Sequence, residues 1–402
     1  MHSNARSGRF NSAMGNTDSR PPDAVNFRMD GWLLLSAGTL LTAGFIALAS
    51  ASLELGERDY GNAFFFLSRQ AVAALIGLSG AVLAYRVPSR FWARLGLLPM
   101  LLAIALLVLV PVPGMGREVN GSTRWLTLGT PVSVQVSEPV RLMVLMFVAG
   151  YAQRHEAALQ RGMGALLKPV ILVAIVAALL LGQPDFGYAA LIMAMTVGVL
   201  FVAGARFRDV SALALACGAA FAALAWTAPY RLARVNTFLD PWSDPLHSGW
   251  QLTQSLMAIG TGHLSGAGLG AGVQKLFYLP EAHTDFIFAV IAEEAGLLGS
   301  LALLAVFALL VARVLAVARS SARRKRMFQA YFALGLALCI GLQVLVNLGV
   351  NMGVLPTKGL ALPLVSYGRS NLVVTLVSLG ILLRIDRENA ALEPGRPSRS
   401  RR

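Results

Sequence analysis

The sequence predicts an all-α integral membrane protein of about ten transmembrane helices, with both termini in the cytoplasm and large extracytoplasmic loops. Of its 402 residues, 56% are hydrophobic and only 13% are charged, whereas soluble domains are about half apolar and about a quarter charged. Apolar runs of membrane-spanning length recur along the chain, and Lys and Arg concentrate in alternate segments between them. The composition therefore excludes a soluble globular protein.

Ten apolar stretches are long enough, or nearly so, to cross a bilayer, for which a helix needs about 20 residues. In chain order they are residues 31–53, 64–85, 93–111, 138–152, 169–182, 187–205, 210–228, 285–312, 328–353 and 362–383. Residues 31–388 are therefore expected to form a single ten-helix membrane domain. Residues 1–30 are polar and are expected to form a disordered cytoplasmic tail, not a cleavable signal peptide. Residues 389–402 are expected to form a basic cytoplasmic tail.

The formal net charge is +14, and the positions of the positive residues agree with the expected topology. With the N-terminus inside, most of the 34 Lys and Arg side chains fall in cytoplasmic segments, and the run Arg323–Arg326 is interpreted as a topology anchor. This distribution accounts for the charge without a nucleic-acid partner. Cys217 and Cys339 lie within apolar runs, so they are interpreted as small hydrophobic side chains, not as a disulfide pair or metal ligands.

Two long segments, about 112–137 and about 229–284, are expected on the outer face, and functional residues concentrate in such loops. Ten cations in or near the expected external loops and helix ends oppose the usual bias of positive charge toward the cytoplasm. A phosphate-bearing lipid explains them, because guanidinium groups bind phosphate oxygens in pairs and Lys adds a point charge. The alternative is pairing with nearby acids such as Glu118 and Glu138. The cations in question are Arg58, Arg69, Arg117, Arg124, Arg141, Arg231, Arg234, Lys275, Lys358 and Arg369.

The stretch Leu279–Phe288 places Glu281, His283 and Asp285 at the mouth of the helix expected at 285–312. A carboxylate in this position can act as a general base toward a hydroxyl group. Asp285 is expected in the first helical turn, where the helix dipole stabilises a negative charge, so helix capping is the alternative role. These three residues are the strongest catalytic candidates in the chain.

Three further features concern local structure. Ser137 is expected to be the N-cap of the fourth helix, with Glu138 in its first turn. The glycine-rich run 266–272 lacks the strand and helix that flank a dinucleotide site, and is interpreted as a flexible or re-entrant turn. Arg369 is expected about two turns into the helix at 362–383, facing the protein interior or a wet cavity.

Three strings closely resemble the FtsW/RodA/SpoVE family, called SEDS proteins, over about residues 30–388. They are Gly116–Ser122, Leu279–Phe288 and Leu355–Leu360. Within the family, the segments 273–275 and 356–359 look more like FtsW, the cell-division branch, than like RodA.

The chain departs from the family pattern at four positions. One is Val136, where the family pattern Gln-Pro-Ser-Glu has proline. Family members usually show Gly-Gly-Ser-Ser after Ser-Tyr, where this chain has Arg369 and Asn371. Arg141 stands where lysine is common, and it keeps the charge while changing the geometry of pairing.

The resemblance implies a peptidoglycan glycosyltransferase that polymerises lipid II during septal cell-wall synthesis in the bacterial inner membrane. It implies an essential role for Asp285, and partnership with a class B penicillin-binding protein of the FtsI type and other divisome proteins. A divalent cation, Mg²⁺ or Mn²⁺, bridging Asp285 and the pyrophosphate is a hypothesis, since no metal motif is visible. The side chains expected to bind pyrophosphate or sugar are Arg117, Arg124, Glu138, Arg141, Lys275, Glu281, His283, Lys358 and Ser366.

Two other functions remain open from the sequence. A transporter that flips the same lipid would use a polar path through the membrane, and a noncatalytic divisome scaffold would tolerate replacement of Asp285. The residues of the flippase path would be Arg141, Asp185, Glu293, Glu294 and Arg369.

Overall fold

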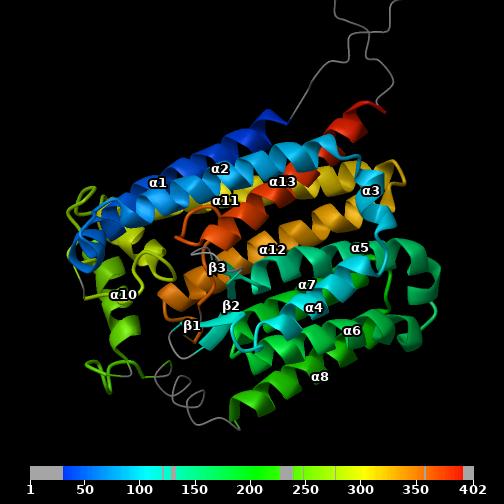
Figure 1. Cartoon of the computed structure of the whole chain (residues 1–402), viewed down its shortest axis with the longest axis horizontal. Helices are drawn as coiled ribbons and strands as arrows, with labels where there is room; N and C mark the ends of the chain where they lie inside the picture. The colour runs from blue at the N-terminus through cyan, green and yellow to red at the C-terminus, as the bar shows by residue number, and fades with distance from the viewer. Residues whose placement is uncertain are drawn as a thin grey trace, which may run out of the picture.

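The structure is a computed structural model that describes residues 30–119, 122–127, 133–226, 238, 240–247, 249–276, 278–356 and 359–392. Each of the ten predicted apolar stretches corresponds to a helix (Figure 1). These helices are α1 Gly31–Tyr60, α2 Phe65–Arg86, α4 Leu98–Leu109, α5 Ser137–Leu159, α6 Met163–Gly182, α7 Phe186–Val202, α8 Phe207–Trp226, α11 Ile287–Arg323, α12 Met327–Asn351 and α13 Arg369–Ala390. Two shorter helices, α3 Ser89–Arg94 and α10 Trp250–Thr261, lie between them in the chain.

The helices confirm a mostly helical protein with several membrane spans. Among the described residues, α1, α2, α6, α11 and α12 are long and apolar enough to cross a bilayer, and α4 and α7 are shorter apolar helices. Helices α5 and α13 are less apolar because they carry polar side chains such as Glu138 and Asn371 into the protein interior. In lipid such groups must find partners within the protein.

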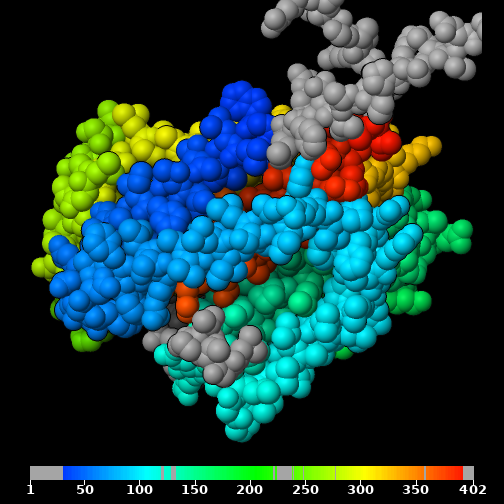
Figure 2. Space-filling model, turned by 45° about the horizontal axis from the view of Figure 1, so that its top comes forward, coloured from blue at the N-terminus to red at the C-terminus, as the bar shows by residue number. Residues whose placement is uncertain are grey.

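Helix α12 lies in the middle of the bundle and contacts α5, α7, α10, α11 and α13. Helix α2 packs along α13, and α1 packs along α11. The start of α1, the end of α13 and α3 lie at one end of the bundle, whereas α10 and a small sheet lie at the other (Figure 1). In the space-filling view, part of α13 is visible in a hollow between α2 and the segment that contains α4 (Figure 2).

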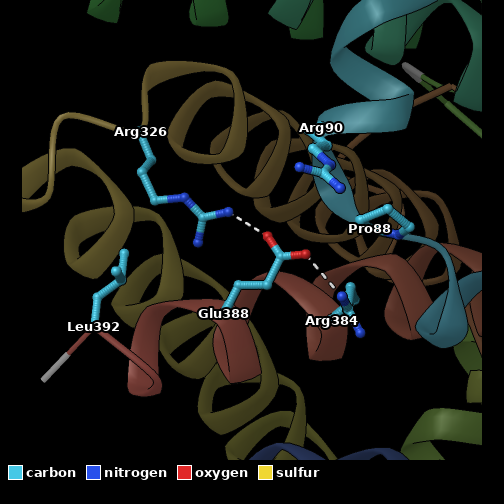
Figure 3. Close-up of a pocket in the computed structure, with 6 residues that line it drawn as sticks. All are labelled: Pro88, Arg90, Arg326, Arg384, Glu388 and Leu392. Atoms are coloured by element: carbon cyan, nitrogen blue, oxygen red, sulfur yellow. Dashed lines mark hydrogen bonds and ion pairs between the residues drawn. The ribbon is translucent and has the colours of Figure 1, made fainter.

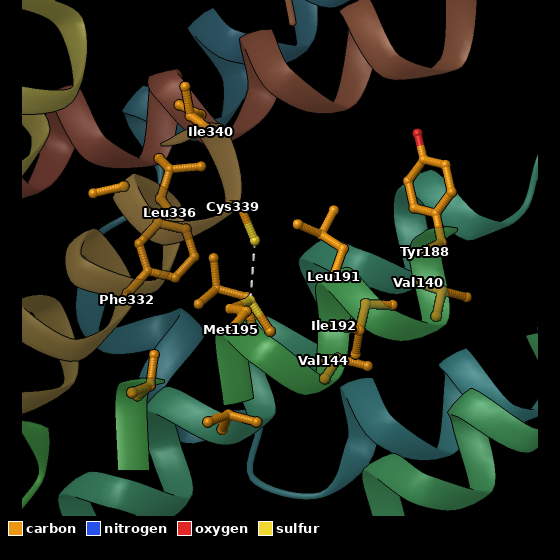
Figure 4. Packing of buried hydrophobic residues seen from close by; sticks show 14 of the residues in the cluster. Val140, Val144, Tyr188, Leu191, Ile192, Met195, Phe332, Leu336, Cys339 and Ile340 are labelled. Atoms are coloured by element: carbon orange, nitrogen blue, oxygen red, sulfur yellow. Dashed lines mark hydrogen bonds between the residues drawn. The ribbon is translucent and has the colours of Figure 1, made fainter. Parts of the chain in front are cut away.

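The apolar core between α5, α7 and α12 is closely packed (Figure 4). Phe332 and Leu336 of α12 lie beside Met195 of α7, and Cys339 Sγ is 3.1 Å from Met195 Sδ. Cys339 is buried and Cys217 is partly buried, and both are free thiols.

The prediction of an all-α chain is wrong in the first outer loop. Strands β1 Gly116–Val119, β2 Ser122–Thr127 and β3 Ser133–Gln135 form an antiparallel sheet in the order β1-β2-β3. Trp125 of the middle strand, β2, pairs with Arg117 of β1 and with Gln135 of β3. Thr, Trp and Val residues in this loop favour extended structure, which hydropathy alone does not reveal.

Several helix ends differ from the prediction. Helix α1 continues to Tyr60 and ends at Gly61, whose φ of 63° gives the left-handed conformation typical of helix C-termini. Val136, not Ser137, is the N-cap of α5, while Glu138 lies in the first turn as predicted. Helix α13 continues to Ala390, beyond the domain end expected at 388.

Helix α11 is broken at Gly296, where φ is 66° and ψ is −164°. The carbonyls of Glu293 and Glu294 accept from the N–H groups of Ala267 (2.9 Å) and Gly268 (3.0 Å). The N–H groups of the next two residues, 297 and 298, donate to carbonyls of residues 263 and 264. The glycine-rich loop therefore replaces the hydrogen bonds that the broken helix lacks, as backbone at membrane depth requires.

Candidate active site

Asp285 lies in the loop that leads into α11. The helix begins at Ile287 with Phe286 as its N-cap, so the prediction that Asp285 occupies the first turn is wrong by two residues. The Asp285 side chain is partly exposed. Its backbone carbonyl accepts hydrogen bonds from the side-chain amides of Asn347 (2.9 Å) and Asn351 (3.0 Å). Two bonds to one carbonyl fix the position of the catalytic candidate.

Asn347 and Asn351 belong to the middle helix, α12, and are 1% and 0% exposed. Asn347 also donates to the Leu360 carbonyl (2.8 Å), and Asn351 Oδ1 accepts from the Ala289 N–H (3.2 Å). The pair thus joins the start of α11 to the segment before α13. Sequence reasoning missed these residues, although two amides four residues apart on one face of an apolar helix are a recognisable signal.

Gly359 lies against the Asp285 carboxylate. A Cβ atom at residue 359 would be 2.7 Å from Asp285 Oδ2, closer than side chains tolerate. The structure therefore brings together two of the three strings singled out in the sequence, Leu279–Phe288 and Leu355–Leu360. Lys358, a predicted phosphate ligand in the second string, lies outside the described residues.

Glu281 and His283 shape the turn before Asp285. The Glu281 carbonyl accepts from the N–H groups of Thr284 (3.1 Å) and Phe286 (3.2 Å), and its carboxylate accepts from Thr284 Oγ1 (2.7 Å). The His283 ring packs between Phe66 and Tyr367, with ring centroids 4.7 and 5.5 Å away.

Burial lowers the pKa of His283 below its ordinary value, while the nearby Glu281 charge acts in the opposite direction. The ring is therefore neutral near pH 7.

Ser366 stabilises the turn before α13. Its Oγ accepts from the Leu362 N–H (2.8 Å), and its carbonyl accepts from Gln70 Nε2 (3.2 Å) on α2. The side chain is buried. Ser366 holds the backbone near the site and is not itself open to substrate in this conformation.

The two arginines of the outer sheet have different surroundings. Arg117 on β1 is exposed. Arg124 on β2 donates to the carbonyls of Gln183 (3.0 Å) and Pro184 (2.7 Å), which ties the sheet to the α6–α7 loop. Burial raises the pKa of the neighbouring Asp185 to about 6, with the Arg124 charge opposing that effect.

Glu138 and Arg141 form a buried ion pair on α5, with 3.1 Å between Oε2 and the guanidinium. Glu138 also accepts from Asn371 Nδ2 (2.6 Å) and from the Tyr188 hydroxyl. Arg141 donates to Gln343 and, at 3.4 Å, to Thr375. Pairing with an acid, the alternative considered for the outer cations, is therefore confirmed for Arg141.

Lys275 is also paired within the protein. Its ammonium donates to Ser50 Oγ (2.7 Å), the Gly270 carbonyl (2.8 Å) and Glu294 Oε1 (2.7 Å), so all three of its N–H groups have acceptors. The Lys275 side chain is only 7% exposed. It anchors the glycine-rich loop to α1 and α11 and does not face solvent, contrary to the prediction of a phosphate ligand.

Arg369 is the first residue of α13, not a residue two turns inside a helix. Gly368 is extended, and the N–H groups of Gly368 and Tyr367 donate to Gln70 Oε1 (3.3 Å) and to the His283 carbonyl (2.9 Å), which holds this segment out of helical form. Arg369 contacts Ser133 Oγ of β3 at 3.4 Å.

Comparison with protein-family models matches residues 31–391 to a family described as FtsW, RodA and SpoVE cell cycle proteins. The chain belongs to this FtsW/RodA/SpoVE family. The match covers every helix from α1 to α13, so the resemblance found in the three strings extends over the whole membrane domain.

Curated members of the FtsW/RodA/SpoVE family are similar along nearly their full length. A probable peptidoglycan glycosyltransferase FtsW from Thioalkalivibrio sulfidiphilus is 46% identical over 92% of this chain and 93% of that protein. A protein with the same description from Nitrosococcus halophilus is 48% identical over 89% of this chain and 92% of that protein. The names of these relatives agree with the expected likeness to the FtsW branch.

Two solved structures share the fold. A chain from a peptidoglycan synthase complex, solved to show how polymerization and crosslinking are coordinated, gives a TM-score of 0.73 at 33% identity over 90% of this chain and 99% of that one. Thermus thermophilus RodA, a rod shape determining protein, gives 0.65 at 31% identity over 90% of this chain and 98% of that one.

Two residues that depart from the FtsW/RodA/SpoVE pattern, Arg141 and Asn371, contact the same carboxylate, that of Glu138. Arg141 pairs with Glu138, and Asn371 donates to the same carboxylate. The two unusual residues therefore belong to one polar cluster and do not line the surroundings of Asp285 independently.

Proposed function

We propose that this chain is a peptidoglycan glycosyltransferase that polymerises lipid II at the outer face of the bacterial inner membrane during septal cell-wall synthesis. The observation that carries the proposal is the Asp285 carboxylate, partly exposed and fixed through its backbone by Asn347 and Asn351. The curated relatives described as FtsW glycosyltransferases supply the reaction class.

The proposed topology has ten spans with both termini in the cytoplasm. The ion pair between Asp30 and Arg313, 2.5 Å long, joins the start of α1 to the second half of α11. Arg326 and Glu388 pair at the same end of the bundle, next to the basic segments of the chain. Excess Arg and Lys at one end support a cytoplasmic location for it, which places Asp285 at the outer end of α11. Residues 1–30 and 389–402 are then the proposed cytoplasmic tails.

Asp285 is proposed as the general base. It accepts the proton of an acceptor sugar hydroxyl while that oxygen bonds to the anomeric carbon of the donor. The bond between this carbon and the pyrophosphate oxygen breaks, and the anomeric centre is inverted. The leaving group is the lipid pyrophosphate, so no nucleotide is needed.

Cations at the outer end stabilise the departing pyrophosphate. Arg117 is exposed there, and Lys358 directly precedes Gly359, which contacts Asp285. Arg141 and Lys275 instead support the site through buried pairing, because their charges are already neutralised by Glu138 and Glu294.

A divalent cation fits the donor chemistry of this site. Among the described residues no group of three His, Cys, Asp or Glu side chains forms a metal cage. Mg²⁺ is commonly held by one or two carboxylates together with substrate phosphates, a set that Asp285 and a pyrophosphate provide. When bound, Mg²⁺ or Mn²⁺ would neutralise charge on the leaving group.

We also propose that the chain works beside a class B penicillin-binding protein, a transpeptidase, together with other divisome proteins. The solved peptidoglycan synthase complex, whose member chain shares this fold, supports that pairing.

The decisive experiment measures glycan chain formation from lipid II by the purified chain, with and without its penicillin-binding partner and Mg²⁺ or Mn²⁺. Asp285→Asn is compared with Asp59→Asn, the same change at an exposed carboxylate near the end of α1. We expect polymer from wild type and Asp59→Asn and none from Asp285→Asn. Absence of polymer from folded, partner-bound wild type, with lipid II movement across vesicles, would replace the proposal with a flippase. Full activity of Asp285→Asn would remove Asp285 as the base.

A further inference from the structure

A basic pocket of about 360 Å³ lies at the end of the bundle away from Asp285 (Figure 3). Asp285 lies shortly before the start of α11, and Arg326 lies shortly after its end. The 37 residues of α11 therefore separate the two sites. The pocket is lined by Pro88, Arg90, Arg326, Arg384, Glu388 and Leu392. The pocket therefore joins three segments that are distant in sequence. They lie around α3, between α11 and α12, and at the end of α13.

Glu388 organises two of the three arginines. Its Oε1 accepts from Arg384 Nε (2.7 Å) and from the Ser89 N–H (3.0 Å), and its Oε2 accepts from Arg326 and Ser89 Oγ. One carboxylate and three guanidinium groups line the pocket, which leaves it with an excess of two positive charges. Ser89 is fully buried, so this end of the pocket is rigid.

The guanidinium groups retain donors for a ligand. Arg90 is exposed and has no hydrogen bond or ion pair with any residue that the structure describes. Among the same residues, Arg384, which also lines the pocket, uses only its Nε, so its two terminal nitrogens have no hydrogen-bond partner there. Arg326 is already engaged, because its terminal nitrogens also contact Asn389 and Ser89. Planar groups of this kind suit the oxygens of a phosphate.

Apolar side chains border the charged groups. Leu392 closes one side of the pocket and is 58% exposed, and Phe91, next to Arg90, is 49% exposed. A ligand with a phosphate and an attached apolar chain would satisfy both parts of this surface, whereas free phosphate would satisfy only one.

We propose that this pocket binds the phosphate of an anionic phospholipid headgroup in the inner leaflet, with the lipid chains lying along the apolar border. Basic pockets between transmembrane helices on the cytoplasmic side, and Arg clusters just inside the membrane, attract anionic lipids. Residues 396, 399, 401 and 402 are further arginines that follow the pocket in the sequence. The site goes beyond glycosyl transfer and does not depend on Asp285; only its leaflet follows from the proposed topology.

Native mass spectrometry of the purified chain tests the site. The chain is titrated with phosphatidylglycerol, with phosphatidylcholine and with inorganic phosphate, and bound lipid is counted. We expect saturable binding of phosphatidylglycerol, weaker binding of phosphatidylcholine, and little displacement by inorganic phosphate at equal concentration. Arg90→Ala removes one unpaired cation and should weaken phosphatidylglycerol binding about fivefold, because a basic residue near an anionic surface contributes about 1 kcal/mol.

Arg94→Ala is the matched control, since Arg94 is an exposed arginine on the same short helix that does not line the pocket. It should bind phosphatidylglycerol as wild type does, and Arg90→Glu should bind it more weakly than Arg90→Ala. Equal losses of phosphatidylglycerol binding in Arg90→Ala and Arg94→Ala would overturn the pocket as the binding site. They would indicate diffuse attraction between anionic lipid and the basic surface instead. Equal binding of both lipids, or full displacement by inorganic phosphate, would overturn the anionic lipid as the ligand.

Discussion

The side-chain amide of Asn351 lies 3.0 Å from the backbone carbonyl oxygen of Asp285, and so joins the middle helix of the bundle to the catalytic candidate. Asn347, one turn earlier, makes the same contact at 2.9 Å. The partly exposed Asp285 is thus positioned by two residues that are almost fully buried.

Asn351→Ala should therefore greatly lower the rate of polymerisation, while lowering the free energy of unfolding only modestly. Losing buried hydrogen bonds costs about 1–3 kcal/mol, while misplacing a catalytic group by about 1 Å can reduce the rate about 100-fold. The measurement is the initial rate of glycan formation beside the unfolding temperature in detergent. Asn389→Ala is the control, because Asn389 is an equally buried amide bonded to Ser321 at the other end of the bundle. A rate loss no larger than that of Asn389→Ala would contradict the positioning role.

Gly359→Ala tests the close approach to Asp285. The added methyl group would meet Asp285 Oδ2 at 2.7 Å and push the carboxylate or its loop aside. We expect a rate loss of about 10-fold to 100-fold, with a normal unfolding temperature. Gly341→Ala, at a position in α12 with nothing within 4 Å of an added Cβ, should leave the rate unchanged. Wild-type rates for both variants would show that the packing around Asp285 is not important for the reaction.

The fold was predictable from sequence where it depends on local hydropathy. All ten apolar stretches are helices, because a continuous apolar run in lipid has to satisfy its own backbone. The start of α13 was not predictable. Residues 362–365 are as apolar as the interior of a membrane helix, but the chain after them is held by residues distant in sequence. Gln70 donates to the Ser366 carbonyl, and the His283 carbonyl accepts from the Tyr367 N–H.

The same limit applies to the site. Asp285 and its loop stand out as polar residues at a helix mouth, and Gly359 belongs to a recognisable string. The role of Lys275 depends instead on Ser50, which is 225 residues away in the sequence, and on Glu294 across the loop. From its sequence position at the outer face, Lys275 was predicted to bind phosphate. In the folded protein its ammonium instead bonds to Ser50 and Glu294, and so holds the loop in place.

Lys275→Met separates these two roles. If Lys275 is an anchor, the change leaves Glu294 buried without its partner, which typically costs about 3–5 kcal/mol. We expect a large drop in unfolding temperature, partly restored in the double variant Lys275→Met/Glu294→Gln. A phosphate ligand would behave differently, with a raised KM for lipid II and an unchanged unfolding temperature. Thermal unfolding and KM measured on the same samples decide between the two.

His283 predicts a pH dependence of stability. Burial lowers its pKa in the folded protein, so the folded ring stays neutral while the unfolded ring, with a pKa of about 6.5, takes up a proton as the pH falls. The unfolded state is then favoured progressively as the pH drops below about 6.5 toward the folded-state pKa. His283→Gln should flatten the curve of unfolding temperature against pH in this range. His247→Gln, in the exposed loop before α10, should keep the wild-type slope; identical slopes for all three proteins would remove His283 as the cause.

The buried cluster around Glu138 predicts coupling between two of the departures from the family pattern, Arg141 and Asn371. Arg141 and Asn371 contact the same carboxylate, so removing either leaves Glu138 more dependent on the other. Arg141→Lys restores the common family residue, but one ammonium cannot reproduce the fork that reaches Glu138, Gln343 and Thr375. A double-mutant cycle of Arg141→Lys and Asn371→Ser, followed by unfolding in detergent, should give a coupling energy of about 0.5–3 kcal/mol. Arg141→Lys paired with the distant Asn389→Ala should be additive within about 0.5 kcal/mol. Additivity in both cycles would mean that Glu138 does not link the two residues, and that the departures arose independently.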